Sequence, residues 1–93
     1  MKMNYVEGSD KDRITLYTLT TCIWCKKTKQ FLHDLGVGYH YVDVDALEGE
    51  EREEAMEEVK RWNPDCSFPS IVIDESTCIV GFDETKIKAA LGR

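Results

Sequence analysis

Two cysteines, Cys22 and Cys25, stand between a strand-like run and a helix-like run of the sequence. Residues 14–17 before them are apolar or β-branched, and the helical pattern after them extends to about Leu35. Residues i and i+3 share one face of a helix, so the Cys25 thiol can reach a disulfide formed at Cys22. In a βαβ pattern of a chain without a secretion signal, this spacing is typical of a redox pair.

The position of Cys22 at the predicted start of the helix gives the two thiols different roles. Free backbone N–H groups and the positive end of the helix dipole favour a thiolate there, and Lys26 adds positive charge nearby. We predict Cys22 as the nucleophile, Cys25 as the resolving thiol and Lys26 as a thiolate-stabilising residue. Two other interpretations stay open: a structural or inert pair of thiols, and half of a zinc site. A four-cysteine zinc site usually has a second close pair, whereas Cys66 and Cys78 are far apart in sequence.

Length and charge limit the class of protein. The 93 residues suffice for one small domain, and the net charge of −6 argues against a nucleic-acid partner, which requires a basic stripe. No apolar run approaches the ~20 residues of a membrane span, and the first ten residues lack the apolar segment of a signal peptide. We therefore expect a cytoplasmic protein without a membrane partner, and a monomer by default. Structural disulfides are rare in the cytoplasm, which favours a redox role for the pair.

Periodicity and chain breakers predict seven elements in the order β-α-β-α-β-β-α. The strands are expected at residues 13–18, 39–45, 70–74 and 78–80, and the helices at about 23–35, 49–62 and 83–91. Residues 1–12 are polar and are expected to form a loose tail, and residues 13–93 form the domain. One βαβ crossover and one hairpin predict an α/β fold, a four-stranded mixed sheet flanked by three helices on its two faces.

Three separated motifs make residues 13–91 resemble a glutaredoxin-type member of the thioredoxin fold. They are Thr21-Cys22-Ile23-Trp24-Cys25, Phe68-Pro69 before a strand, and Gly81-Phe82-Asp83 at the start of the last helix. The resemblance implies a thioredoxin-like fold, disulfide reduction as the activity, no tightly bound cofactor and no metal, and glutathione as a co-substrate.

The resemblance also assigns residues to the site. It implies that Pro69 is cis and faces Cys22, and that the backbone of Phe68 pairs with a bound peptide or glutathione like an added strand. The residues expected to bind substrate or glutathione are Thr21, Trp24, Phe68, Pro69, Gly81, Phe82 and Asp83.

Several positions differ from the glutathione-binding members of the family. Those members often have a lysine where this chain has Leu19, and a proline and a tyrosine where it has Ile23 and Trp24; Val80 replaces the first of two glycines. The Phe-Pro and Gly-Phe pairs are more similar to NrdH-type redoxins, which take electrons from a reductase. The implied partners are disulfide-containing proteins, ribonucleotide reductase among them, and the electron donor is either glutathione or a reductase.

Three functions from different classes are therefore compatible with the sequence. The first is a dithiol–disulfide oxidoreductase that reduces protein or mixed disulfides through Cys22 and Cys25. The second is a carrier of a [2Fe–2S] cluster held between two chains by the nucleophilic cysteine and glutathione, and the third is a non-catalytic interaction domain. Trp24 is either an exposed contact residue or simple packing, and Cys66 is either an auxiliary redox thiol or an ordinary loop cysteine.

Overall fold

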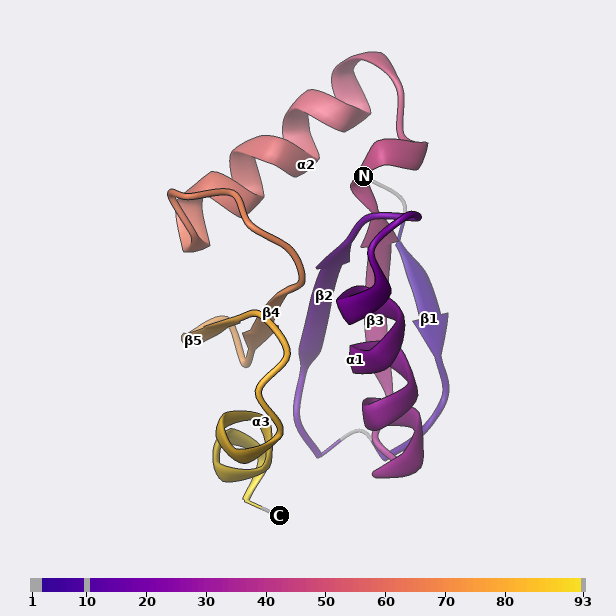
Figure 1. The fold of residues 1–93 in the computed structure, drawn as a ribbon, viewed down its shortest axis with the longest axis vertical. Helices are drawn as coiled ribbons and strands as arrows, with labels where there is room; N and C mark the ends of the chain where they lie inside the picture. The colour runs from indigo at the N-terminus through magenta and orange to yellow at the C-terminus, as the bar shows by residue number, and fades with distance from the viewer. Residues whose placement is uncertain (1–2, 10, 93) are drawn as a thin grey trace.

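The computed structural model describes residues 3–9 and 11–92, which form one mixed sheet with helices on both faces (Figure 1). The strands are β1 (Asn4–Val6), β2 (Ile14–Thr18), β3 (Tyr39–Asp43), β4 (Ser70–Ile73) and β5 (Thr77–Val80). The helices are α1 (Ile23–Asp34), α2 (Gly49–Trp62) and α3 (Glu84–Leu91), and a short 3₁₀ helix, η1 (Val44–Ala46), follows β3.

The sheet has the strand order β1-β3-β2-β4-β5. Strands β2 and β3 are parallel, with Leu16 opposite Tyr41, and α1 connects them as the predicted crossover. Strand β4 is antiparallel to β2, and β4 and β5 form the predicted antiparallel hairpin. The predicted mixed sheet with three helices is thus confirmed. Strand β2 lies at the centre of this sheet, and the two-cysteine motif follows the end of β2.

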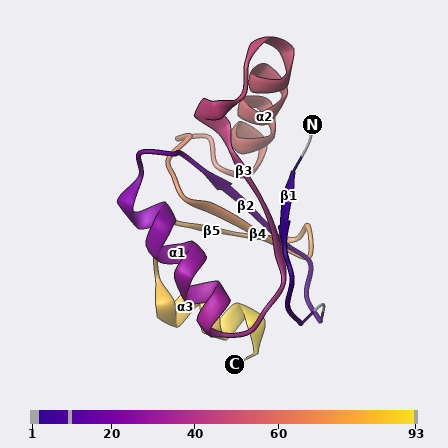
Figure 2. The same ribbon diagram turned by 90° about the vertical axis from the view of Figure 1, so that its right-hand side faces the viewer.

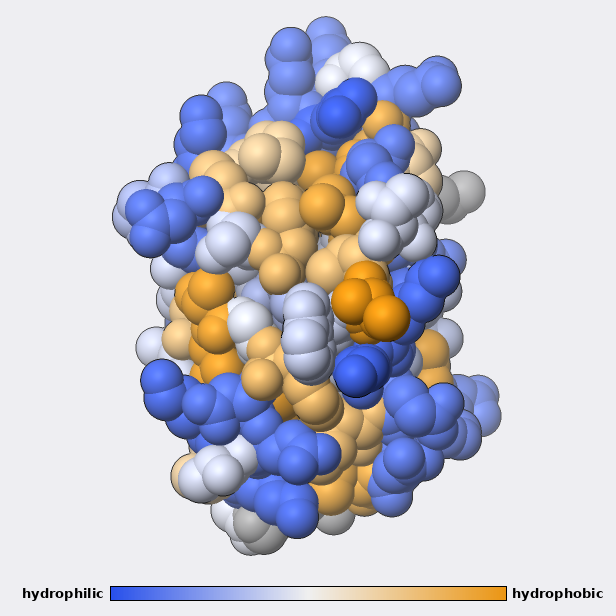
Figure 3. Space-filling model, in the orientation of Figure 1, coloured by the Kyte–Doolittle hydropathy of each residue, from blue (hydrophilic) through white to orange (hydrophobic). Residues whose placement is uncertain are grey.

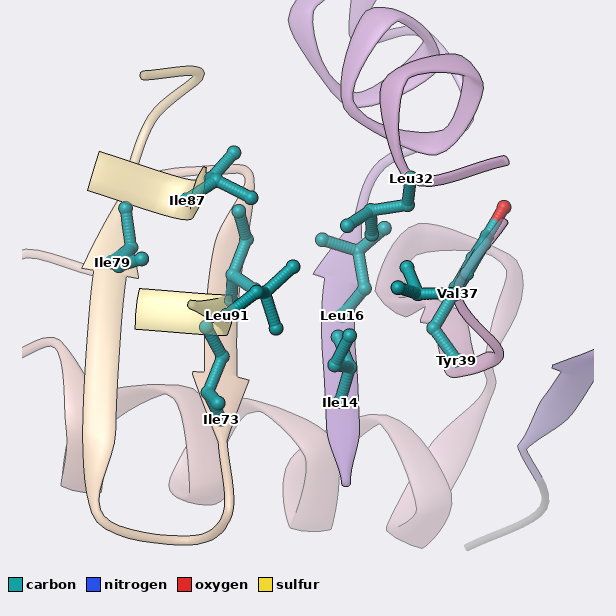
Figure 4. Close-up of a cluster of buried hydrophobic side chains, with 10 residues drawn as sticks. Ile14, Leu16, Leu32, Val37, Tyr39, Ile73, Ile79, Ile87 and Leu91 are labelled. Carbon is teal, nitrogen blue, oxygen red and sulfur yellow. The ribbon is translucent and has the colours of Figure 1, made fainter. Parts of the chain in front are cut away.

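The two faces of the sheet carry separate hydrophobic clusters. Helices α1 and α3 cover one face and α2 covers the other (Figure 2). Because side chains alternate along a strand, Leu16 of β2 points toward α1 and α3, where it packs with Leu32 and Ile87, whereas Tyr17 points toward Val59 of α2. Figure 4 shows the first cluster, in which aliphatic side chains and the Tyr39 ring converge from the strands and from α1 and α3. These contacts hold α1 and α3 against the sheet.

The structure corrects the predicted number of strands from four to five. Within the segment that was expected to be a loose tail, Asn4–Val6 forms β1, which pairs antiparallel with β3 at the edge of the sheet. The Tyr5 ring lies 4.7 Å from the His40 ring on β3. A run of three residues is too short to show a strand periodicity, so this strand depends on contacts that only the folded sheet provides. Residues 1, 2, 10 and 93 lie outside the described part of the chain.

A second correction concerns the strand predicted at 39–45. Strand β3 ends at Asp43, and the chain turns into η1, closed by a hydrogen bond from the Leu47 N–H to the Val44 carbonyl at 3.2 Å. The Asp45 side chain is used in a loop contact described below rather than in the sheet. The other boundaries agree within one residue, the usual uncertainty of helix and strand ends. No helix in the described residues is long and apolar enough to cross a membrane.

Candidate active site

Strand register brings three distant parts of the sequence to one edge of the sheet. Tyr17, near the end of β2, pairs with Ser70 at the start of β4, and Ser70 pairs with Val80 at the end of β5. The two-cysteine motif follows β2, the Phe-Pro pair precedes β4 and the Gly-Phe-Asp motif follows β5. All three predicted motifs therefore meet beside the start of α1 (Figure 1).

Cys22 is the N-cap residue of α1, as its position in the sequence predicted. Its Sγ atom accepts a hydrogen bond from the Cys25 N–H at 3.1 Å, and its carbonyl accepts one from the Lys26 N–H at 3.2 Å. The Cys22 N–H donates to the Leu19 carbonyl at 3.2 Å. These bonds fix the Cys22 sulfur at the positive end of the helix dipole while the side chain stays partly exposed.

Cys25 lies behind Cys22 and is fully buried. Burial, together with the hydrogen bond between the Cys25 side chain and Cys22, raises the pKa of the Cys25 thiol to about 12, and the charge of Lys29 partly opposes this shift. A thiol with that pKa is ionised in only about one molecule in 100,000 at pH 7. The two thiols thus differ in access, and the buried Cys25 thiol holds its proton, which fits a division into an attacking and a resolving cysteine.

A polar network on the inner side of α1 involves Lys29, which the sequence analysis considered only as one of three lysines, with Lys26 and Lys27, that add positive charge after the two-cysteine motif. The Lys29 ammonium lies 3.1 Å from an Asp43 carboxylate oxygen and 4.1 Å from the centre of the Tyr41 ring. The buried Thr18 hydroxyl donates to the same Asp43 oxygen at 2.5 Å. The network ties α1 to the carboxyl ends of β2 and β3. The sequence signal that could have identified Lys29 is its i, i+4 spacing from Cys25. Lys26 is exposed, and its role in stabilising the thiolate stays a prediction.

The loop before the cysteines is anchored to η1. The Thr20 N–H donates to one Asp45 carboxylate oxygen at 2.9 Å, and the Thr20 hydroxyl donates to the other at 2.7 Å. These hydrogen bonds lower the pKa of Asp45 below its ordinary value, so the carboxylate stays ionised well below neutral pH. Thr21, a predicted binding residue, is exposed next to Cys22.

Three aromatic rings extend from the two-cysteine motif toward α3. Trp24 is 53% exposed and stacks on Phe82, with ring centres 6.2 Å apart and ring planes 27° apart. Phe82 also contacts the ring of Phe31 edge-on at 5.7 Å. One side of Trp24 therefore packs, and more than half of the residue is free to contact a partner.

The Phe68–Pro69 peptide bond is cis, as the resemblance implied. Pro69 is fully buried, and its carbonyl accepts a hydrogen bond from the Gly81 N–H at 2.9 Å. Gly81 has a φ of +82°, a conformation that residues with a side chain rarely adopt. Asp83 caps α3 by accepting a hydrogen bond from the Lys86 N–H at 3.0 Å. The hydrogen bond between the Gly81 N–H and the Pro69 carbonyl thus joins the Gly-Phe-Asp motif to the Phe-Pro motif.

Asn63 organises the loop that leads to the cis proline, and the sequence analysis missed it. The residue is only 5% exposed. Its amide donates to the Ser67 hydroxyl at 2.9 Å, to the Ser67 carbonyl at 3.2 Å and to the Ser70 hydroxyl at 3.3 Å. An Asn-Pro pair after a helix indicates a turn. The burial of the Asn63 side chain, however, follows only from the way the loop folds back on α2.

Replacing Asn63 with alanine should lower the free energy of unfolding by about 2 kcal/mol, because the Ser67 hydroxyl and the Asp65 N–H lose the partner that Asn63 gives them, and the Ser67 carbonyl and the Ser70 hydroxyl keep only the bond between them. Urea denaturation measures this change. Asn4→Ala, at an exposed position of β1, is the matched control and should change stability by less than about 0.5 kcal/mol. Equal stability of the two variants would contradict the role given to Asn63.

The remaining cysteines, Cys66 and Cys78, pack against the hydrophobic cluster under α2. Cys66 is partly buried in the loop before β4, with its Sγ atom 3.8 Å from the Pro64 carbonyl oxygen. Cys78 is on β5, and burial raises the pKa of its thiol. Within residues 3–9 and 11–92, no group of three or more His, Cys, Asp or Glu side chains is placed to hold a metal ion.

Comparison with known proteins agrees with this geometry. The sequence model of the glutaredoxin family matches residues 14–77. A glutaredoxin-like 8.6 kDa protein from the rubredoxin operon of Clostridium pasteurianum is 34% identical over 74 residues, which cover 80% of this chain and 91% of that protein. The crystal structure of the glutaredoxin from Methanosarcina mazei Go1 is 52% identical, with a TM-score of 0.91, covering 100% of this chain and 90% of that one. Methanosarcina acetivorans methanoredoxin is 51% identical, with a TM-score of 0.84 and coverage of 87% and 85%.

The sheet, the helices and the paired thiols define a thiol–disulfide protein of the thioredoxin-like fold. The family match spans more than half of the chain, and it includes the two-cysteine motif and the cis proline. The chain belongs to the glutaredoxin family, as the resemblance predicted.

Proposed function

We propose that the protein is a dithiol–disulfide oxidoreductase that reduces protein or mixed disulfides through Cys22 and Cys25. The observation that supports this most is the asymmetry of the two thiols. The Cys22 sulfur is partly exposed and held by the Cys25 N–H at the start of α1, whereas the Cys25 thiol is buried behind it and protonated at neutral pH. A structural disulfide has no need of this difference.

The reaction follows from the positions of the two sulfurs. The Cys22 thiolate attacks one sulfur of the target disulfide, so that a mixed disulfide forms and the other target sulfur leaves as a thiolate. Cys25 then gives up its proton and attacks the Cys22 sulfur, which forms the Cys22–Cys25 disulfide and releases the second target thiol. Two electrons pass from the protein to the target, and the proton of Cys25 ends on a released sulfur.

The candidate electron donors are glutathione and a protein reductase. The absence of the usual lysine at Leu19 and of the first glycine at Val80 favours the reductase, as in NrdH-type redoxins. Asp83 remains where the amino-acid end of glutathione is expected, although one of its oxygens caps α3. We propose disulfide-containing proteins, ribonucleotide reductase among them, as targets. The cytoplasm is the proposed location, because a dithiol needs a reducing compartment to be recycled.

A single-turnover experiment tests this proposal without knowledge of the donor. The reduced protein is mixed with insulin, and the products are digested and mapped by mass spectrometry after the free thiols are blocked. We expect insulin thiols to appear together with a Cys22–Cys25 disulfide, while Cys66 and Cys78 remain blocked as free thiols. Insulin thiols without this disulfide, or no insulin reduction, would contradict the proposal.

The [2Fe–2S] carrier proposed from the resemblance would use Cys22 from each of two chains, with glutathione completing the ligands. Among the contacts of residues 3–9 and 11–92, none favours this function over thiol exchange, whereas the different burial of the two thiols supports thiol exchange. We therefore propose thiol exchange alone.

A further inference from the structure

Exposed apolar side chains lie at the start of α1 and at the end of β5. Of the large apolar side chains that are strongly exposed in the described residues, Ile23 (60%), Trp24 (53%) and Val80 (47%) lie at this edge of the sheet, and Tyr5 lies elsewhere. Ile23 and Trp24 follow the nucleophile directly, and Val80 pairs with Ser70 beside the cis proline. Figure 3 shows pale and orange surface across the middle of one face of the protein, with hydrophilic surface above and below it. We call Ile23, Trp24 and Val80 the apolar rim.

Lysines lie along one side of the apolar rim. The Lys27 ammonium is 4.6 Å from the centre of the Trp24 ring, and the Lys88 ammonium is 6.0 Å from the centre of the Phe31 ring. These rings belong to the stack that Phe82 completes. Two more lysines are exposed on the same helices, and we call the four together the basic flank: Lys26, Lys27, Lys86 and Lys88.

The basic flank keeps its positive charge available. Among the described residues, no carboxylate forms an ion pair with any of these four lysines. The acidic groups on the same two helices and at the cap of α3 are the exposed Asp34 and Glu84 and the capping residue Asp83. The four lysines therefore outnumber these carboxylates by one, although the whole chain carries −6. Much of the negative charge lies on α2, which covers the other face of the sheet.

We propose that the apolar rim and the basic flank form a docking surface for a disulfide-bearing protein segment that has an apolar side chain and acidic residues beside its cysteine. The proposal rests on the proposed oxidoreductase function and specifies its class of substrate. An apolar side chain of the segment packs on the exposed part of Trp24, Ile23 and Val80, and its carboxylates lie near Lys27 and the other lysines. Such charge complementarity mainly sets the association rate and the choice of partner.

Two cyclic peptides test the charge preference. They share one sequence with a disulfide and a leucine, and they differ only in three flanking residues, which are aspartates in one and lysines in the other. The second-order rate constant for reduction by the pre-reduced protein is measured for each peptide in single turnover. The same measurement with dithiothreitol corrects for the intrinsic reactivity of each disulfide. We expect the corrected acidic-to-basic ratio to be on the order of 10 at low salt and to fall toward 1 as salt is added.

The variant Lys27→Glu should lower this ratio at least about fivefold. The ratio is informative because any change in the chemistry of Cys22 affects both peptides alike. Lys11→Glu is the matched control, with the same change in net charge at an exposed loop position before the amino end of β2, and it should keep the native ratio. Val80→Thr, which keeps the shape of the side chain and suits a strand, should slow the reduction of both peptides.

A corrected ratio near 1 in the native protein, or a preference for the basic peptide, would overturn the docking surface while leaving the oxidoreductase function intact. A native-like ratio in Lys27→Glu would show that the basic flank does not bind the acidic residues of the substrate. Full activity of Val80→Thr would show that the apolar rim does not bind its apolar side chain. If the native protein reduces neither peptide and also leaves insulin oxidised, the proposed function fails and the docking surface fails with it.

Discussion

Replacing Cys22 with serine is expected to lower the rate of disulfide reduction by at least about 1,000-fold, to the background of the assay. A serine hydroxyl at this position keeps the N-cap of α1, because its oxygen accepts the same backbone hydrogen bond. It cannot attack a disulfide at neutral pH, since a hydroxyl is far less acidic than a thiol. The variant should therefore fold normally and lose the first chemical step.

Insulin reduction in single turnover measures this effect, with circular dichroism and urea denaturation to show that the fold is intact. The control is Cys78→Ser, which removes a thiol of similar burial on β5, outside the two-cysteine motif, and should keep the native rate. Residual activity above about 1% in Cys22→Ser would show that another group is the nucleophile. In that event Cys66, the partly buried loop cysteine, becomes the residue to replace next.

The sequence was sufficient for the features that repeat along the chain or that stand close together in it. The alternation of apolar and polar residues located four strands and three helices, and the crossover and hairpin motifs followed from their order. The N-cap position of Cys22 was predictable because a helical pattern begins directly after it. These signals are local, and tertiary contacts did not override them.

The features that the sequence analysis missed depend on contacts between distant residues. β1 has three residues and exists because β3 offers it a free edge. Asn63 is buried because its loop returns toward Ser67 and Ser70, a path that composition does not reveal. Phe31, on the far turn of α1, joins the ring stack of Trp24 and Phe82 only because α3 packs beside α1.

Lys29 is an intermediate case. Its spacing from Cys25 was visible in the sequence, but its charge could have pointed to solvent like that of Lys26. In the folded chain the Asp43 carboxylate and the Tyr41 ring hold the ammonium on the inner side of α1, about three-quarters buried. Only the register of β2 and β3, which places Thr18 opposite Asp43, made this network recognisable.

Replacing Cys25 with serine is expected to stop the reaction after its first step, so that a mixed disulfide between Cys22 and the target accumulates. In the native protein the buried Cys25 thiol stands next to the Cys22 sulfur and competes with every external thiol. If its effective concentration is only about 1 M, well below the values reached by oriented intramolecular groups, it still outcompetes 1 mM external thiol about 1,000-fold. The variant should therefore release product slower by about that factor.

Mass spectrometry after acid quenching measures the trapped species as the sum of the two protein masses. The double variant Cys25→Ser/Cys66→Ser is the comparison that shows whether a loop thiol also resolves the intermediate. If Cys66 contributes, the mixed disulfide decays more slowly in the double variant than in Cys25→Ser. If the intermediate decays at the native rate in Cys25→Ser, the assignment of Cys25 as the resolving thiol is wrong.

The pKa of Cys25 adds a pH dependence to the same prediction. Because burial and the hydrogen bond with Cys22 raise this pKa to about 12, Cys25 in the reduced protein holds its proton at every physiological pH. Iodoacetamide should thus label Cys22 far faster than Cys25 from pH 6 to pH 9, since only a thiolate is alkylated. Labelling of Cys25 should rise about tenfold for each pH unit across this range, because its ionised fraction rises by that factor while the pH stays below the pKa. Peptide mapping after timed exposure gives both rates, and equal labelling of the two cysteines at pH 7 would show that the second thiol is neither shielded nor protonated as the structure requires.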